Sequence, residues 1–446
     1  MKQTTLHRTE TNVSRILAKS GSLSFMMNVA GVGLAVLMQV VLARLLGVVS
    51  YGYYAFVMTV ITFIAFPANL GFDTAIVRFV SSYKADRLWG EVKGLLRRAN
   101  QLTLLVSLVL MGISGVVIYA MYRNSEGEFY YTFLTGLLII PLMATATLRQ
   151  NSLLALKEVL VAQLPEKVLR PVFVIVIVYA YTVVFHVKAG AFEAMVIFVG
   201  SMLLSYLFGA WVLNRKLTPH TRDYPHRFQT KHWLSESLTL MVNSGMYLIL
   251  GQLSVVMIGM MHSTSESGIF SAAVRIATMV SFAITSINMI AAPMISESYA
   301  KGDLKQMQKV CTLSGRSGFA FAGLVFVTIL LLGEWILGLF GEAFKAGTTA
   351  LILLSLSHLV HSYCGQSGTV MTMTGQQRAS SRILMISTVL NVAFNLLLIP
   401  SLGMIGAALA NLLSTAFCYF SMMFKVKRSM QIVTGVWMPG RIGSKS

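Results

Sequence analysis

The residues of this chain that could do chemistry are a few charged side chains set in long apolar segments. Arg275 lies well inside one such segment, where an arginine is costly and usually faces a cavity or an anion. Because a guanidinium can donate two parallel hydrogen bonds to a phosphate, Arg275 is predicted to bind phosphate. The alternative is that its long side chain reaches the nearer membrane interface.

Two further arginines, Arg44 and Arg78, lie near the ends of other apolar segments and are additional candidates for phosphate binding. For Arg44 the alternative is an interfacial anchor, and for Arg78 it is an ion pair with Asp73. Asp73 is also the acidic residue best placed to change protonation within the membrane. Coupling to protons or sodium requires such a group, so Asp73 is predicted to couple or gate transport.

Two histidines, His358 and His361, could offer metal ligands at helical spacing, but the sequence supplies no third ligand nearby. A hydrogen-bonded pair is therefore predicted, with no metal site. The sequence contains no GxSxG, HExxH, P-loop or CxxC motif. We expect neither an enzyme nor a cofactor, with coupling to H+ or Na+ left open.

The composition places the chain in a lipid bilayer. Of its 446 residues, 56% are hydrophobic and only 11% are charged, whereas about a quarter of residues are charged in soluble domains. Lys and Arg number 35 against 16 Asp and Glu, a formal charge of +19. The basic residues stand in short clusters between apolar segments, which argues against nucleic acid as a partner.

Twelve apolar segments follow one another, each of about the 20 residues that span a bilayer. Most Lys and Arg residues fall in alternate loops or at the span ends beside them, among them Arg149, Lys167 and Arg170, which predicts that these loops and both termini are cytoplasmic. The expected fold is an all-α polytopic membrane protein with twelve transmembrane helices. The predicted segments are 22–46, 51–78, 99–122, 129–149, 168–187, 190–213, 236–261, 268–293, 314–340, 346–373, 383–400 and 402–424.

A repeat divides the chain into two lobes of six helices. An offset of 216 residues aligns Tyr51-Gly52 with Ser267-Gly268, and Gly190-Ala191 with Gly406-Ala407. Because six is even, both lobes have the same topology, and parallel repeats of this kind place the substrate site between them. The predicted parts are an N-terminal lobe over 1–213, a cytoplasmic linker over 214–235, a C-terminal lobe over 236–424 and a basic cytoplasmic tail over 425–446.

Polar residues recur at helical spacing on the segments that would line a cleft between the lobes. Taken singly, Ser, Thr and Asn residues often hold transmembrane helices together, but their occurrence on symmetry-related helices favours a wet cleft. The predicted cavity-lining residues are Asn28, Gln39, Thr59, Thr62, Asn69, Asn243, Tyr247, Ser271, Thr278, His358, Ser362 and Gln366.

Three regions of the sequence resemble a known family. The runs RLLGVVSYGYYAF and NLGFDTAIVRFVS resemble the second-helix region of bacterial polysaccharide and O-antigen flippases. These flippases belong to the multidrug/oligosaccharidyl-lipid/polysaccharide exporter (MOP) superfamily. SGIFSAAVRIATM resembles their eighth-helix region, and TGQQRASSRILMISTVLNVAFNLLLIPSLGMIGAALANLLS resembles their last two helices. The resemblance implies a MATE-like fold of two lobes.

The resemblance also implies a function. Such a flippase moves an oligosaccharide linked to undecaprenyl diphosphate to the outer leaflet of the bacterial inner membrane by alternating access. The product serves O-antigen, capsule or exopolysaccharide synthesis, with a polymerase and a chain-length regulator as partners besides membrane lipid. Arg275 matches the family's basic position in the eighth helix.

Three other functions are alternatives. A cation-coupled multidrug exporter commonly carries an acidic residue in its first helix, and residues 21–46 contain none. A lipid II-type flippase usually has a charged first helix and extra C-terminal helices. A membrane-embedded glycosyltransferase or polymerase normally has long outer loops, whereas those expected here are short.

Overall fold

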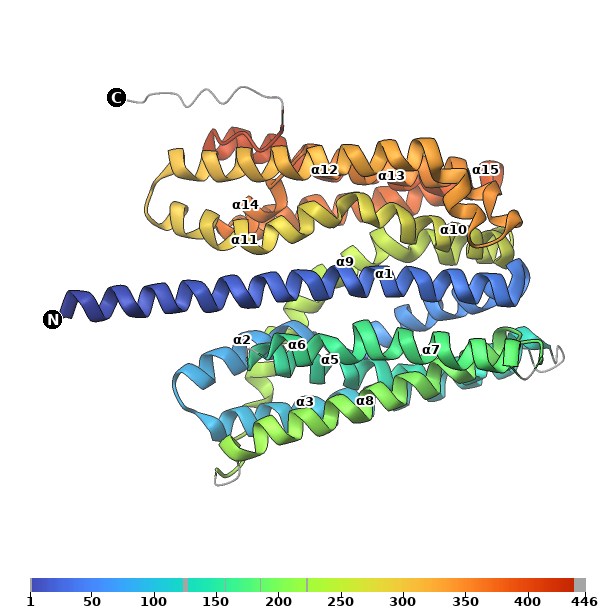
Figure 1. Ribbon diagram of the computed structural model, residues 1–446, viewed down its shortest axis with the longest axis horizontal. Coiled ribbons are helices and arrows are strands. Elements are labelled where there is room, and N and C mark those ends of the chain that lie inside the picture. Colours follow the sequence, from blue (N-terminus) through green and yellow to red (C-terminus); the bar gives the residue numbers. More distant parts are fainter. Residues whose placement is uncertain (1, 123–126, 157, 185, 222–223, 437–446) are drawn as a thin grey trace. The chain divides into compact units, whose positions relative to one another are not determined.

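The described part of the chain folds into helices and short connections in the computed structural model (Figure 1). This structure describes residues 2–122, 127–156, 158–184, 186–221 and 224–436, and within them every regular element is a helix. In hydrocarbon, a helix satisfies its own backbone hydrogen bonds, which an isolated strand cannot do. The predicted all-α fold is confirmed.

Ten helical stretches of the described residues are long and apolar enough to cross a membrane. Two of these stretches are long enough for two membrane crossings each, because about 20 residues suffice for one crossing. They are Met26–Asn69, with 44 residues, and Gln377–Met430, with 54. Gly47 (φ 76°, ψ 171°) and Gly403 (φ 54°, ψ −132°) break these stretches with backbone conformations that a Cβ would hinder. The ten stretches thus make twelve helices, as predicted, while the cytoplasmic side of the termini stays a prediction.

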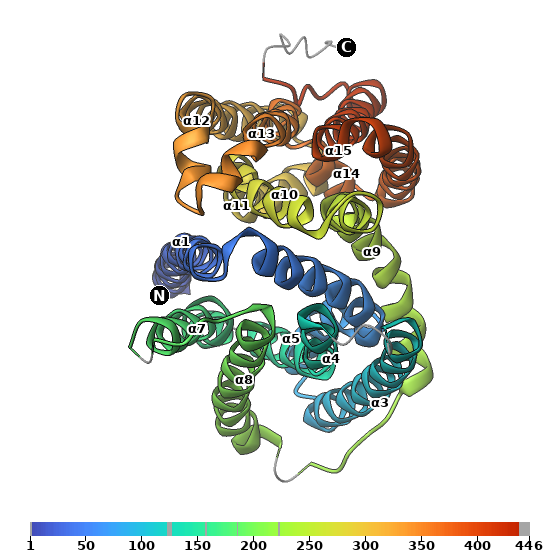
Figure 2. The same cartoon turned by 90° about the vertical axis from the view of Figure 1, so that its right-hand side faces the viewer.

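The chain forms two compact units, and Figure 2 shows the helices of each nearly end-on. Unit 1 comprises Met1–Leu46 and Val60–Val242. Its core surrounds the buried Trp233, whose indole nitrogen donates to the Tyr83 hydroxyl at 3.0 Å. Its elements are α1 (Lys2–Ala65) without residues 47–59, η1 (Phe66–Asn69), α2 (Phe72–Ala85), α3 (Trp89–Tyr122), α4 (Glu128–Gly136), α5 (Ile139–Ala155), α6 (Val159–Leu164), η2 (Pro165–Leu169), α7 (Arg170–Tyr179), η3 (Ala180–Val184), α8 (Ala191–Thr221) and α9 (Thr230–Met261) as far as Val242.

Unit 2 comprises Gly47–Thr59 and Asn243–Ser446. Gly52 and Gly268, which the 216-residue offset aligns, lie against each other in this unit, and a Cβ on Gly268 would lie 2.7 Å from Gly52 Cα. The repeat therefore brings two equivalent glycines to one helix crossing. The remaining elements are α10 (Thr264–Ala277), η4 (Thr278–Ser281), α11 (Phe282–Ala300), α12 (Leu304–Gly338), η5 (Glu342–Gly347), α13 (Thr348–Tyr363), α14 (Ser367–Met373) and α15 (Gln377–Met430).

The predicted second helix, 51–78, is interrupted rather than continuous. A 3-10 turn containing Pro67 is followed by the left-handed Leu70 (φ 49°) and Gly71 (φ 75°). A Cβ on Gly71 would lie 1.9 Å from the Ser237 carbonyl oxygen, so only glycine fits there. The predicted eighth helix, 268–293, is interrupted by η4 (Thr278–Ser281). The 216-residue offset maps η4 onto residues 62–65, directly before η1. Both members of this symmetric pair are therefore broken near their middle.

The predicted linker 214–235 and the predicted basic tail 425–446 both include helical residues. Helix α8 continues to Thr221 and α9 begins at Thr230, because intrahelical hydrogen bonds hold a helix together outside hydrocarbon as well. Between them, the Arg227 amide donates to the Gly90 carbonyl at 3.2 Å. In the tail, α15 extends to Met430 and Thr434 is buried. Residues 437–446 of the predicted tail lie outside the described residues.

Candidate functional site

A cavity of about 290 Å³ lies within unit 2, between α9, α10, α13 and α15. Three of the predicted lining residues, Tyr247, Thr278 and His358, come together on its wall. Their helices are brought together by α13 packing along α15 and α10. The other polar residues on its wall are Gln252, Ser254, Ser281, Ser357, His361, Asn411, Thr415 and Tyr419.

The chemistry of this wall is neutral and aromatic. None of the described residues that line the cavity is an Asp, Glu, Lys or Arg. His361 stacks on Tyr419 with ring centroids 3.9 Å apart and an interplanar angle of 22°. Hydroxyl, amide and imidazole groups offer both donors and acceptors, and ring faces offer dispersion contacts. Such a wall suits an uncharged polyhydroxyl group better than an ion.

A chain of buried hydrogen bonds fixes the helices beside the cavity. Ser254 donates to Asn395 Oδ1 at 3.0 Å, and Asn391 Nδ2 donates to Ser414 at 2.9 Å. Ser357, on the cavity wall, donates to Asn411 Oδ1 at 3.0 Å. Interhelical bonds of this kind are the structural role that small polar residues often have in membranes. Part of the polar pattern in the sequence is therefore structural.

Five predicted lining residues of unit 2 lie outside the lining set of this cavity. Ser362 is buried and donates to the His358 carbonyl at 3.0 Å, while Gln366 is fully buried, and neither of its amide atoms has a partner among the described residues. Asn243 and Ser271 are half-buried on α9 and α10. A fifth residue, Thr59, is buried and donates to the Ala55 carbonyl at 2.8 Å.

Arg275 is exposed on α10, between two residues of the cavity wall, Val274 and Thr278. It also lies near enough to the buried Tyr51 to interact with it electrostatically. Among the described residues no carboxylate pairs with the Arg275 guanidinium. Arg275 is thus a cation without a counter-charge among the described residues, on a helix that also lines the neutral polar cavity.

The predicted site residues of unit 1 are spread along several helices. Arg44 is exposed and Gln39 is buried on α1, while Thr62 and Asn69 are half-buried. The Oδ1 atom of Asn69 is buried and, within the described part of the chain, has no hydrogen-bond partner. Asn28 on α1 receives a hydrogen bond from Lys167.

The alternative pairing of Arg78 with Asp73 is wrong. Arg78 Nη1 lies 3.2 Å from Glu236 Oε2 on α9, and both side chains are largely exposed. Asp73, in the first turn of α2, instead accepts a hydrogen bond from the Thr74 amide at 2.8 Å. This bond satisfies a helix N-terminal N–H group, which is a local structural role.

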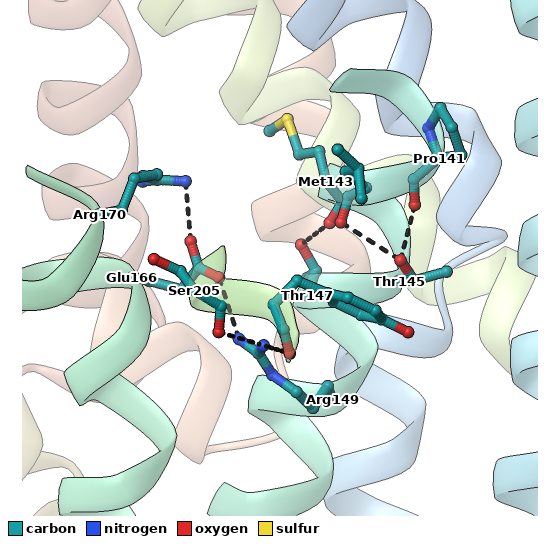
Figure 3. A network of polar contacts seen from close by, with 10 residues as sticks. Pro141, Met143, Thr145, Thr147, Arg149, Glu166, Arg170 and Ser205 are labelled. Atoms are coloured by element: carbon teal, nitrogen blue, oxygen red, sulfur yellow. Dashed lines mark hydrogen bonds and ion pairs between the residues drawn. The ribbon is translucent and has the colours of Figure 1, made fainter. Parts of the chain in front are cut away.

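A cluster of charges in unit 1 lies in the two candidate spans Glu128–Ala155 and Val159–Val184. The cytoplasmic side predicted for Arg149 and Arg170 stays a prediction. Arg149 on α5 is only 3% exposed and lies 3.0 Å from Glu166, which lies 2.7 Å from Arg170 (Figure 3). The Arg149 guanidinium packs against Gly209 of α8, where a Cβ would lie 2.4 Å from its Cζ. The only sequence signal was the spacing of Glu166 and Arg170, i and i+4 on one helix face.

This chain is similar to known proteins in sequence and in structure. The family model described as "Polysaccharide biosynthesis protein" matches residues 17–299, and one described as "MatE" matches residues 240–397. The probable low-salt glycan biosynthesis flippase Agl15 of Haloferax volcanii is 24% identical over 404 residues, which cover 90% of this chain and 81% of that protein. The probable flippase AglR of the same organism is 30% identical over 222 residues, 48% of this chain and 44% of its own.

Solved structures agree on the fold. An inward-facing multidrug resistance MATE family transporter of the MOP superfamily has a TM-score of 0.74 at 14% identity, covering 89% of this chain and 95% of its own. A MOP superfamily transporter from Pyrococcus furiosus, described as having a binding pocket of reverse polarity, has a TM-score of 0.65 at 16% identity. It covers 92% of this chain and 96% of its own. The fold is therefore MATE-like, as predicted.

Proposed function

This chain belongs to the polysaccharide biosynthesis protein family, is a membrane transporter and not an enzyme, and from that premise we propose that it flips a lipid-linked oligosaccharide. Transport proceeds by alternating access, as is usual for transporters built from parallel repeats. Its two flippase relatives, Agl15 and AglR, support this class of substrate.

One observation carries the proposal for the site, namely a neutral polar cavity next to an uncompensated arginine. Tyr247, His358 and Asn411 on the cavity wall would bind sugar hydroxyls, and Arg275 would bind the phosphate that joins the sugar to its lipid. A cationic drug would instead favour carboxylates, and the wall carries none among its described residues. The polyprenyl chain can remain in the bilayer, because it is as apolar as the lipid around it.

The membrane potential can drive this transport without an ion gradient. A diphosphate of charge about −2 that moves outward gains ~2.3 kcal/mol per charge per 100 mV, or roughly 4 to 5 kcal/mol in total. Coupling to protons or sodium through Asp73 would add to this driving force but is not required. We therefore expect Asp73→Asn to retain transport that responds to the potential.

The finer parts of the proposal concern the carrier and its pathway. We propose undecaprenyl diphosphate as the carrier and the bacterial inner membrane as the location. The oligosaccharide would enter O-antigen, capsule or exopolysaccharide synthesis through a polymerase and a chain-length regulator. The two named relatives come from an archaeon, so the identity of the polyprenyl carrier should be the first variable in the assay.

The test is leaflet movement of a labelled polyprenyl-diphosphate oligosaccharide in proteoliposomes, measured by accessibility to an added glycosidase. We expect movement above protein-free vesicles, with acceleration by an outward-driving potential. Arg275→Ala should abolish movement and Arg275→Lys should retain part of it. Arg316→Ala, which removes an exposed arginine of α12, serves as the matched control. No movement, in vesicles that exchange cationic dyes for protons, would refute the proposal.

A further inference from the structure

Lys167 is a cation inside a candidate span of unit 1. It belongs to η2 (Pro165–Leu169), within the span Val159–Val184. It is half-buried, and its ammonium group donates to Asn28 Oδ1 on α1 and to Gln163 Oε1 at 3.3 Å. A charged group within a span is costly and is usually found where it binds or relays something.

The neighbouring charges leave Lys167 without a counter-charge. Glu166 is already engaged by Arg149 at 3.0 Å and by Arg170 at 2.7 Å (Figure 3). Among the described residues no carboxylate forms an ion pair with Lys167, whose partners are two neutral amide oxygens. The three cations and one carboxylate of this cluster carry a formal excess of two positive charges.

The fold makes room for this lysine. Gly31 on α1 packs against the lysine stem, and a Cβ there would lie 2.9 Å from Lys167 Cβ. Asn28, three residues before Gly31 on the same helix face, accepts a hydrogen bond from the ammonium group. A lysine whose stem and head are both held by α1 differs from one that reaches freely for the membrane interface. Its position is therefore determined by specific contacts of unit 1.

We propose that Lys167, with Asn28 and Gln163, binds a phosphate group inside unit 1. An ammonium group is a compact charge suited to phosphate, and each amide can rotate to present its NH2 group to an oxyanion in place of its oxygen. The ligand class is a phosphate ester or diphosphate. If the proposed function holds, this ligand is the diphosphate of the lipid-linked oligosaccharide, and Lys167 is a phosphate contact additional to Arg275.

The test measures binding of defined phosphate probes to the full-length protein in neutral detergent by microscale thermophoresis. The probes are geranylgeranyl diphosphate, phosphatidylglycerol and inorganic pyrophosphate, with geranylgeraniol as the neutral control. Loss of a charge-assisted hydrogen bond of about 1.5–3 kcal/mol corresponds to roughly 10- to 100-fold weaker binding. We expect that loss for Lys167→Gln, near wild-type affinity for Lys167→Arg, and no binding of the alcohol.

Two further variants separate binding from folding. Lys216→Gln removes a lysine of unit 1 that pairs with Glu158 at 2.7 Å, and it should bind as the wild type does. Asn28→Asp keeps the lysine and gives it a carboxylate partner, so it should fold well yet lose phosphate affinity. The proposal is refuted if Lys167→Gln and Asn28→Asp both bind the phosphate probes like the wild type, or if the wild type binds none of them.

The probes distinguish the source of the phosphate, because tighter binding of the diphosphate lipid than of phosphatidylglycerol indicates the carrier. Equal affinity for pyrophosphate indicates that the phosphate alone is recognised. The flipping assay keeps the two proposals separate. If the wild type flips the lipid-linked oligosaccharide and Lys167→Gln flips it equally well, only the proposed Lys167 site is refuted. A wild type that does not flip, but binds pyrophosphate through Lys167, overturns the flippase proposal only.

Discussion

Replacing Glu166 with glutamine should destabilise unit 1 strongly, because Glu166 compensates two arginines. Arg149 is 3% exposed and Glu166 is 13% exposed, with 3.0 Å between Nη2 and Oε1. Breaking a buried ion pair by removing one partner costs about 3–5 kcal/mol, since the other charge remains buried. Arg149 keeps the Ser205 and Tyr206 carbonyl oxygens at 3.1 and 2.8 Å, which places the expected cost near the lower limit, at about 3 kcal/mol.

The matched control is Glu236→Gln, the same change in an exposed ion pair. Arg78 and Glu236 lie 3.2 Å apart, with side chains 65% and 44% exposed, and such pairs contribute about 0–1 kcal/mol. For a unit of about 200 residues, 1 kcal/mol shifts Tm by roughly 2–4 °C. Glu166→Gln should therefore lower Tm by about 6–12 °C, and Glu236→Gln by at most about 4 °C.

The assay is the fraction of detergent-purified protein that remains monodisperse by size-exclusion chromatography after heating. A double variant, Arg149→Met with Glu166→Gln, should recover part of the loss, because it removes the uncompensated charge together with its partner. Equal melting of Glu166→Gln and Glu236→Gln would show that burial does not strengthen the first pair. The account of this cluster as a structural ion pair would then be wrong.

Three other predictions concern unit 2 and the topology. In Gly268→Ala the new Cβ would lie 2.7 Å from Gly52 Cα, and this overpacking should lower the free energy of unfolding by about 1–3 kcal/mol. The measurement is Tm, and the control is Gly323→Ala, where a Cβ meets nothing within 4 Å. Asn391→Ala removes the 2.9 Å bond to Ser414 and should cost about 0.6–1.7 kcal/mol, again measured by thermal stability. A cysteine in place of Lys305, near the start of α12, should react with an impermeant thiol reagent only in inside-out vesicles, because this segment is predicted to be cytoplasmic. The native Cys311, Cys364 and Cys418 are buried and can remain.

The helices and the repeat could be predicted because their signals are local or periodic. Apolar length alone identified twelve helices, and the 216-residue offset aligned Gly52 with Gly268, which lie against each other in unit 2. The interruption around Gly71 could not be predicted in the same way. It depends on a close approach of Ser237, distant in sequence, to a backbone position where only glycine fits.

The site could be predicted only in part, because long-range pairing decides what a polar residue does. Tyr247 and His358 do line a cavity, whereas Gln366, in the same predicted stripe, is buried away from it. The sequence predicts Arg149 as the last residue of a span, at its cytoplasmic end, since a charge usually marks the end of a span. Its burial requires Glu166, which lies 17 residues later and gives no sign of the contact in the sequence.

The charges within the candidate spans differ in whether a carboxylate compensates them, and we propose that this difference marks residues that bind substrate. Arg149 and Arg170 share Glu166, which compensates one of their two positive charges and holds both guanidinium groups in place. Lys167 and Arg275 have no such partner among the described residues. An unpaired cation in a span costs about 2.5–3.5 kcal/mol on insertion scales, and a bound phosphate would offset that cost. We propose that Lys167 and Arg275, for which the described residues supply no carboxylate partner, are cations that a phosphate substrate would stabilise.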